Sequence, residues 1–214
     1  MIPAFFRLAL PNGTFIAKTG TAREQAELAA PLLLLSEDGR LIKRIGHLTP
    51  EEGSNLGLSN RSVSLGKERT HFWVMRRNQY DLQRFTIEGE RDLTLKVDGS
   101  PWMRAWLEEP RGTYTSLEDV RDAGSGRLWV IAQVPVLGAS LRPNINTASW
   151  PTSLELRLST VIEMIDVERG VVLASRRFER EIYSFIDSEY VARQREDATG
   201  FVTWDIYRLE LRER

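Results

Sequence analysis

Four short segments of the chain share one pattern of apolar and polar positions. In each, a polar residue that follows a turn introduces a run of aromatic and aliphatic residues. The segments are residues 14–17, 71–74, 127–130 and 189–192. The second residues of successive segments lie 57, 56 and 62 positions apart. Short runs that are apolar on both faces are typical of strands buried on both sides. The regular spacing indicates a structural repeat.

A second hairpin follows each of the first three runs. The turns of these hairpins are Asp38-Gly39, Glu88-Gly89 and Arg169-Gly170, and glycine accepts the positive φ that a tight turn requires. In the last unit a strand over 203–211 is followed by no partner strand. Each unit therefore reads as four antiparallel strands, with the fourth strand missing from the last unit.

The repeat predicts an all-β fold, because segments rich in helix formers are scarce. Blades of four antiparallel strands bury their inner strands between neighbouring blades, as in a β-propeller. We therefore predict a β-propeller of about four blades, in a single domain over residues 1–214. The units fall near residues 5–48, 58–99, 116–180 and 182–214.

Several phrases of the sequence support this prediction by resemblance. They are Leu-Pro-Asn-Gly-Thr-Phe-Ile-Ala at 10–17, Leu-Ser-Glu-Asp-Gly-Arg-Leu at 35–41, Val-Ile-Glu-Met-Ile-Asp at 161–166 and Tyr-Arg-Leu-Glu-Leu at 207–211. In these phrases the chain resembles the C-terminal blades of bacterial six-bladed β-propeller proteins of the NHL/TolB-like type. The resemblance implies about two further blades, so the chain would form a partial or open ring. It also implies export from the cytoplasm, whereas residues 1–10 lack the basic region of a signal peptide, and we leave the localisation open.

The charge balance restricts the class of partner. Among 214 residues, Lys plus Arg number 29 and Asp plus Glu 30, for a net charge of −1. Such a balance argues against non-specific electrostatic binding of nucleic acid, so we expect a protein or small-molecule partner.

The longest near-apolar run, 28–35, is too short to be a transmembrane segment and contains Pro31. Cysteine is absent, which excludes disulfides, thiolate nucleophiles and cysteine-ligated zinc.

The sequence contains no recognisable catalytic motif. The two histidines, His47 and His71, lie in different units without metal-ligand spacing. No glycine-rich phosphate loop, zinc-protease helix or nucleophile elbow occurs. Carboxylates are abundant, but no pair is singled out for acid–base work. We therefore assign no catalytic, metal-binding or cofactor-binding residue and expect no cofactor, and we lean towards a protein that is not an enzyme.

Two long irregular stretches, 98–116 and 135–154, are the candidate binding surface. In a four-stranded blade both loops emerge on the same face, beside the third blade. Their candidate ligand- or partner-binding residues are Trp102, Arg104, Trp106, Tyr114, Arg142 and Trp150, and Trp and Arg are enriched in the cores of interfaces. Alternatively, the loops fold back and plug an incomplete blade.

These observations favour a non-catalytic binding or scaffold protein that presents its long-loop face to a ligand or protein. One alternative is a metal-dependent hydrolase, similar to lactonase propellers, with carboxylates at a central channel. Another is a truncated propeller without independent function. Exposed blade edges invite pairing with another chain, so we also expect a homo-oligomer if the ring stays open.

Overall fold

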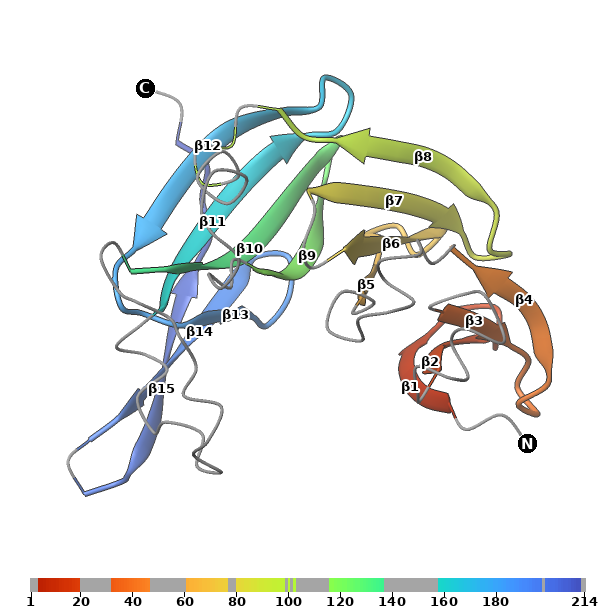
Figure 1. The fold of residues 1–214 in the computed structure, drawn as a ribbon, viewed down its shortest axis with the longest axis horizontal. Helices are drawn as coiled ribbons and strands as arrows, with labels where there is room; N and C mark the ends of the chain where they lie inside the picture. The colour runs from red at the N-terminus through yellow and green to blue at the C-terminus, as the bar shows by residue number, and fades with distance from the viewer. Residues whose placement is uncertain are drawn as a thin grey trace, which may run out of the picture. The chain divides into compact units, whose positions relative to one another are not determined.

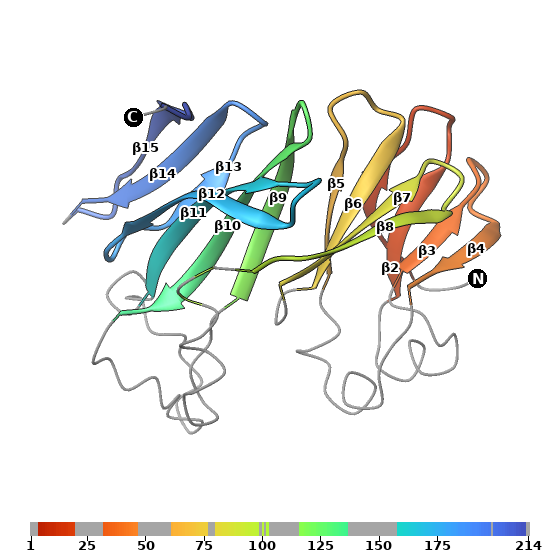
Figure 2. The same cartoon turned by 90° about the horizontal axis from the view of Figure 1, so that it is seen from above.

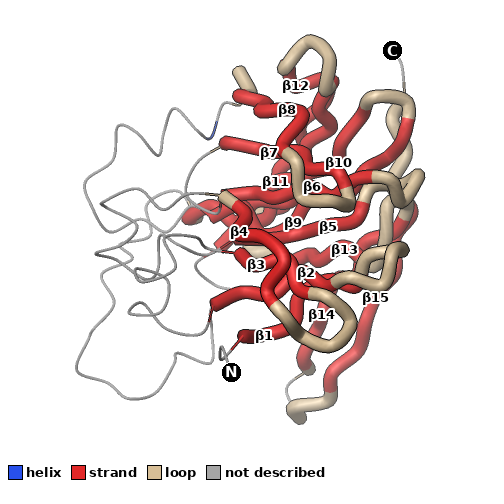
Figure 3. Tube along the Cα trace, turned by 90° about the vertical axis from the view of Figure 1, so that its right-hand side faces the viewer, coloured by secondary structure: helices blue, strands red, loops and turns tan. Residues whose placement is uncertain are grey.

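The computed structural model describes residues 4–19, 32–46, 61–76, 80–98, 100, 102, 116–136, 158–197 and 199–212. Strands joined by turns make up almost all of these residues (Figure 3). The strands are β1 (Ala4–Ala9), β2 (Phe15–Thr19), β3 (Leu32–Leu35), β4 (Leu41–Ile45), β5 (Arg61–Leu65), β6 (His71–Arg76), β7 (Asp81–Thr86), β8 (Arg91–Lys96), β9 (Ser116–Gly124), β10 (Arg127–Pro135), β11 (Leu158–Asp166), β12 (Val171–Phe178), β13 (Tyr183–Phe185), β14 (Tyr190–Glu196) and β15 (Val202–Arg208) (Figure 1).

The strands form four antiparallel sheets in which each strand pairs with the next along the chain (Figure 2). Three sheets have four strands, in the orders β1-β2-β3-β4, β5-β6-β7-β8 and β12-β11-β10-β9. Within the described residues the fourth sheet has three strands, β13-β14-β15. The predicted all-β fold of four-stranded antiparallel blades is confirmed, and the described residues supply three strands of the last blade.

One irregularity recurs in the three four-stranded sheets. Where the third strand pairs with the fourth, the register shifts by one residue, next to the hairpin turn. The extra residues are Ile42, Asp92 and Leu173, each near the start of the fourth strand. A bulge increases the local twist of a strand pair. Its recurrence at one position indicates that the three sheets are copies of one unit, although their sequences differ there.

The predicted hairpin turns at Asp38-Gly39 and Glu88-Gly89 are present. The φ of Gly39 is 79° and that of Gly89 is 78°, in the left-handed region that glycine adopts without strain. Gly89 also lies close to the first sheet, since an added Cβ would come within 3.2 Å of the Ile45 side chain. Glycine at 89 therefore serves both the turn and the packing.

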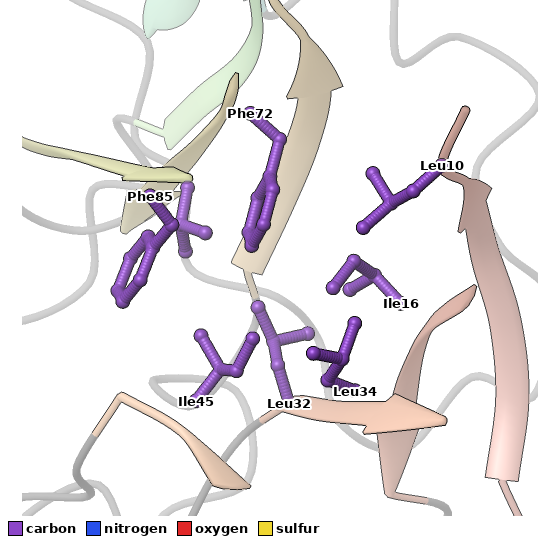
Figure 4. Packing of buried hydrophobic residues seen from close by; sticks show 8 residues of the cluster. Leu10, Ile16, Leu32, Leu34, Ile45, Phe72 and Phe85 are labelled. Carbon is purple, nitrogen blue, oxygen red and sulfur yellow. The ribbon is translucent and has the colours of Figure 1, made fainter. Parts of the chain in front are cut away.

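The chain divides into two compact units, residues 1–96 and 97–214. In the first unit, one face of the β1–β4 sheet packs against the β5–β8 sheet (Figure 4). Phe72 and Phe85 stack at 5.4 Å between ring centroids. They meet aliphatic side chains from the first sheet, namely Leu10, Ile16, Leu32, Leu34 and Ile45. Apolar packing between the faces of neighbouring sheets is what a blade architecture requires.

In the second unit the β9–β12 and β13–β15 sheets enclose another apolar core. Its buried members are Trp129, Ile131, Ile162, Met164, Tyr183, Phe185 and Val191. Strand β11 is buried along all but its last residue. It nevertheless carries three buried polar side chains, Ser159, Thr160 and Glu163. Each of these forms hydrogen bonds that help shape the surfaces described below.

Candidate functional site

Only one of the six candidate binding residues of the long loops lies within the described structure. Trp102 is buried, with 7% of its surface exposed. The other five residues lie outside the described residues: Arg104, Trp106, Tyr114, Arg142 and Trp150. The long-loop surface therefore stays a prediction.

The start of the first long loop is attached to the third sheet. The Asp98 N–H donates to the Gly170 carbonyl at 3.1 Å. The Ser100 hydroxyl donates to Glu163 Oε1 at 3.0 Å, and the Ser175 hydroxyl donates to the same oxygen at 2.9 Å. Glu163 is only 1% exposed, so these hydroxyls compensate part of the cost of burying its carboxyl group. Glu163 thus anchors the loop to β11.

A cleft lies between the third and fourth sheets, on the face of β11 opposite Glu163. We call it the inter-sheet cleft, and its volume is about 700 Å³. Its walls come from β10–β15, from residues 179–181 and from the segment after β15. The lining residues are Trp129, Ile162, Ala174, Ser175, Arg176, Phe178, Glu179, Glu181, Tyr183, Val191, Arg193, Tyr207, Arg208, Leu209, Glu210, Leu211 and Arg212. This volume is in the range of small-molecule sites.

Three aromatic rings line the cleft in a row that joins the two sheets. Phe178 at the end of β12 lies 4.7 Å from Tyr183 on β13, measured between ring centroids. Tyr183 in turn lies 5.8 Å from Tyr207 on β15. Arg176 lies over the Phe178 ring at 5.0 Å, a distance at which the cation is attracted to the ring. The wall thus combines aromatic surface with a positive charge.

A polar group lies next to this aromatic row. The Tyr183 hydroxyl donates to Glu181 Oε2 at 2.7 Å, and Arg193 forms an ion pair with Glu181 Oε1 at 2.9 Å. Burial, followed by the hydrogen bond to Glu181 and the charge of that carboxylate, raises the pKa of Tyr183 to about 12. Tyr183 is therefore a neutral phenol at physiological pH, and Glu181 is held by both neighbours.

The connection from β12 to β13 forms one wall of the cleft and is fixed by the start of β11. The Thr160 hydroxyl donates to the Glu181 carbonyl at 2.6 Å and accepts from the Tyr183 N–H at 3.2 Å. The Ser159 hydroxyl donates to Glu179 Oε2 at 2.6 Å. Both side chains are fully buried. They position the residues that carry Tyr183 and Glu181.

The carboxylates of the cleft are engaged by arginines. Besides the pair formed by Glu181, Glu179 pairs with Arg177 at 2.6 Å, and Glu210 pairs with Arg212 at 3.4 Å. For Arg176 the described residues provide no carboxylate partner. Within the described part of the chain, no group of three or more His, Cys, Asp or Glu side chains could hold a metal ion. The arrangement suits binding through rings and an arginine.

Sequence reasoning did not identify the inter-sheet cleft. Phe178, Tyr183 and Tyr207 come from three strands, and along the chain each looks like an ordinary apolar position of a β-strand. The available signal was the pair Ser159-Thr160, together with Glu163, inside the apolar run 158–165. Buried polar side chains in such a run require partners, and here the partners of the first two fix the wall of the cleft.

No protein-family model matches the chain. No curated protein matches it either. Among solved structures, it is similar to a member of the DUF4221 family from Bacteroides vulgatus, with a TM-score of 0.53 and 10% identity over 97% of this chain and 64% of that one. It is also similar to the acylaminoacyl peptidase of Pyrococcus horikoshii, with a TM-score of 0.51 and 12% identity over 98% of this chain and 31% of that one.

A further similar structure is the β-propeller domain of the trilobed protease from Pyrococcus furiosus. Its TM-score is 0.41 at 11% identity, over 100% of this chain and 57% of that one. The chain spans less than two thirds of each of these three proteins. Identities this low show a likeness of fold and not of activity. With its four sheets of consecutive antiparallel strands, the fold is of the propeller type. The described residues contain no helix long and apolar enough to cross a membrane.

Proposed function

We propose that this chain is a non-catalytic binding protein of the β-propeller type that takes up a ligand in the inter-sheet cleft. The observation that carries the proposal is the row of Phe178, Tyr183 and Tyr207 beside Arg176, on a cleft of about 700 Å³. Clefts that bind small molecules combine apolar and aromatic walls with a few polar groups that orient the ligand. The inter-sheet cleft has this composition.

The lining chemistry favours a ligand with an aromatic or apolar body and one anionic group. The three rings offer stacking surface, and Arg176 offers a guanidinium for a carboxylate, sulfonate or phosphate. The acidic side chains at the cleft are already neutralised by arginines, so they do not repel an anion strongly. A cationic ligand would have to displace one of these arginines, which is less favourable.

The same contacts support a binding role over a catalytic one. A general acid or base needs a pKa near the working pH and must lie within hydrogen-bonding distance of the substrate. Tyr183, with a pKa raised to about 12, stays protonated at neutral pH. Glu181 is occupied by Tyr183 and Arg193. These groups are better suited to shaping the wall than to transferring protons.

The dye 1-anilinonaphthalene-8-sulfonate tests the proposal, because it joins aromatic rings to one anionic group. We expect its fluorescence to rise on saturable binding to the folded chain. Arg176→Gln should raise the dissociation constant roughly tenfold or more, the usual effect of losing a charge-assisted contact, and Tyr207→Leu should also weaken binding. Arg44→Gln, which removes an exposed arginine on β4, is the matched control. Equal binding by the Arg176 and Arg44 variants would refute the cleft as the site.

The long loops 98–116 and 135–154 form a second part of this proposal. They would present Trp102, Arg104, Trp106, Tyr114, Arg142 and Trp150 to a protein partner. The hydrogen bond between Ser100 and Glu163 supports an ordered start for the first loop.

Membership of the six-bladed NHL/TolB-like type belongs to the proposal as well. It is supported by the resemblance in the turn and strand phrases at 10–17, 35–41, 161–166 and 207–211. The hydrolase alternative predicts that Ca²⁺ raises the melting temperature, because a ligand bound only by the folded state stabilises it.

A further inference from the structure

The third strand of the fourth sheet differs in burial from the third strands of the other sheets. Of the four residues of β3, three are buried, and β11 is buried along all but its last residue. In β15, by contrast, six of the seven residues are exposed and none is buried. The exposed side chains include Trp204 at 56% and Ile206 at 63%. Within the described residues β15 pairs with β14 alone.

The outer edge of β15 lacks several of the usual protections against strand pairing. Natural edge strands are protected by charged side chains, above all Lys, by Pro or by a bulge. The sequence of β15, Val-Thr-Trp-Asp-Ile-Tyr-Arg, contains neither Lys nor Pro, and its register with β14 is regular from end to end. Its central charged residue, Asp205, forms an ion pair with Arg195 of the neighbouring strand at 2.6 Å. A regular edge strand of this length is a template for another strand.

Two hydrogen bonds at the ends of the β14–β15 ladder determine which backbone groups face outward. The Leu209 N–H donates to the Glu189 carbonyl at 2.7 Å, and the Asp197 N–H donates to the Phe201 carbonyl at 3.1 Å. Both bonds lie in the register of the ladder and link odd-numbered residues. Because backbone groups alternate along an antiparallel strand, the N–H and C=O groups of Val202, Trp204 and Ile206 point away from β14.

We propose that this edge pairs antiparallel with β15 of a second copy of the chain, with Trp204 on the two-fold axis. This register places the outward backbone groups of the two strands opposite each other. It pairs Trp204 with its counterpart, and Val202 of each copy with Ile206 of the other. Cross-strand pairs of aromatic and β-branched residues stabilise a sheet. The result is a continuous six-stranded sheet across the axis.

Charge favours this register over the neighbouring one. With Asp205 on the axis, two carboxylates would stand directly opposite, which is destabilising. With Trp204 on the axis, Asp205 faces Thr203, and Arg208 faces the turn of the other copy at Gly200. That turn carries Asp197. Hydrogen bonds, first from the Thr199 hydroxyl and then from backbone N–H groups, hold the pKa of Asp197 below its ordinary value, so this side chain remains anionic.

Apolar side chains of the edge strand add to the pairing. The exposed large apolar residues that β15 brings to the proposed contact are Val202 at 40%, Trp204 at 56% and Ile206 at 63%. In this register Trp204 lies beside its counterpart and Val202 lies beside Ile206, so each of these side chains gains a cross-strand contact.

Light scattering tests the proposal on the full chain. As the protein concentration is raised, the weight-average mass should rise to a plateau at twice the chain mass of 24.5 kDa. Ile206→Lys should raise the dimer dissociation constant by roughly tenfold or more. Val202→Pro should do the same, because it removes an outward N–H without breaking the β14 ladder. The matched control is Ile42→Lys, since Ile42 is 53% exposed on β4. A chain that stays monomeric, or a dimer that only the control weakens, overturns the proposal.

The absence of cysteine allows a direct test of the register. In Trp204→Cys the two thiols would lie across the axis, with Cα atoms about 5.5 Å apart, within the range that a disulfide accepts. Mild oxidation should therefore give a covalent dimer, whereas Ile42→Cys should remain uncoupled. If both variants couple at the same rate, the proposed pairing is wrong. Circular dichroism of each variant confirms that a loss of dimer is not a loss of fold.

Discussion

The buried hydroxyl of Thr160 offers the sharpest test of how the inter-sheet cleft is built. Thr160→Val keeps the shape of the side chain and removes two hydrogen bonds, one to the Glu181 carbonyl and one from the Tyr183 N–H. Thr160 has no exposed surface, so water cannot replace the hydroxyl. Leaving a buried donor or acceptor unsatisfied costs about 1–3 kcal/mol. For the two groups together we expect a loss of about 2–6 kcal/mol in the free energy of unfolding.

Urea unfolding at neutral pH, followed by circular dichroism, measures this loss. The matched control is Thr94→Val, because Thr94 is exposed on β8, away from the cleft and from the edge of β15. An exposed exchange of this kind should change the free energy of unfolding by less than about 0.5 kcal/mol. Thr160→Val should also weaken binding of the naphthalene dye, because the wall that carries Tyr183 loses its support. If Thr160→Val is as harmless as the control, the hydroxyl does not fix the connection and the reasoning fails.

Two further predictions concern Tyr183 and the core of the first unit. Because the pKa of Tyr183 is raised to about 12 from an ordinary value of 10, its contribution to stability is complete below pH 10 and is lost as the pH rises towards 12. Ultraviolet titration should show a phenolate that forms near pH 12 and is absent in Tyr183→Phe, and Glu181→Gln should lower the pKa of Tyr183. Phe72→Ala should cost about 3–5 kcal/mol in the unfolding of residues 1–96, since Phe72 is fully buried against Phe85. By comparison Phe201→Ala, at a 66% exposed position, should cost less than about 1 kcal/mol. Equal costs for the two phenylalanines would contradict the burial pattern.

The strands and hairpins were predictable because they depend on local chemistry. Asp38-Gly39 and Glu88-Gly89 predict tight turns on their own, and the structure has positive φ at both glycines. Short apolar runs such as 71–74 predict buried strands, and four of the six residues of β6 are buried.

The cleft could not be predicted, because it depends on which strand faces meet across two sheets. Phe178 and Tyr207 lie far apart along the chain, and only packing brings both to Tyr183. The sequence also drew attention to tryptophans of the loops, whereas Trp204 lies exposed within a strand. Exposure of a strand residue depends on whether a neighbour covers it, which no local pattern specifies.

The fourth sheet separates its two proposed roles through the alternation of side chains along β15. Tyr207 lies on the side of the sheet that faces the cleft, where it contacts Tyr183. Ile206 lies on the opposite side and is 63% exposed. Two consecutive residues therefore serve different surfaces. Tyr207→Leu should reduce dye binding in monomer and dimer alike, and Ile206→Lys should reduce association while leaving the cleft intact. A ligand site that needed the dimer would lose the dye in both variants, so this pair distinguishes failure of the pairing from failure of the binding role.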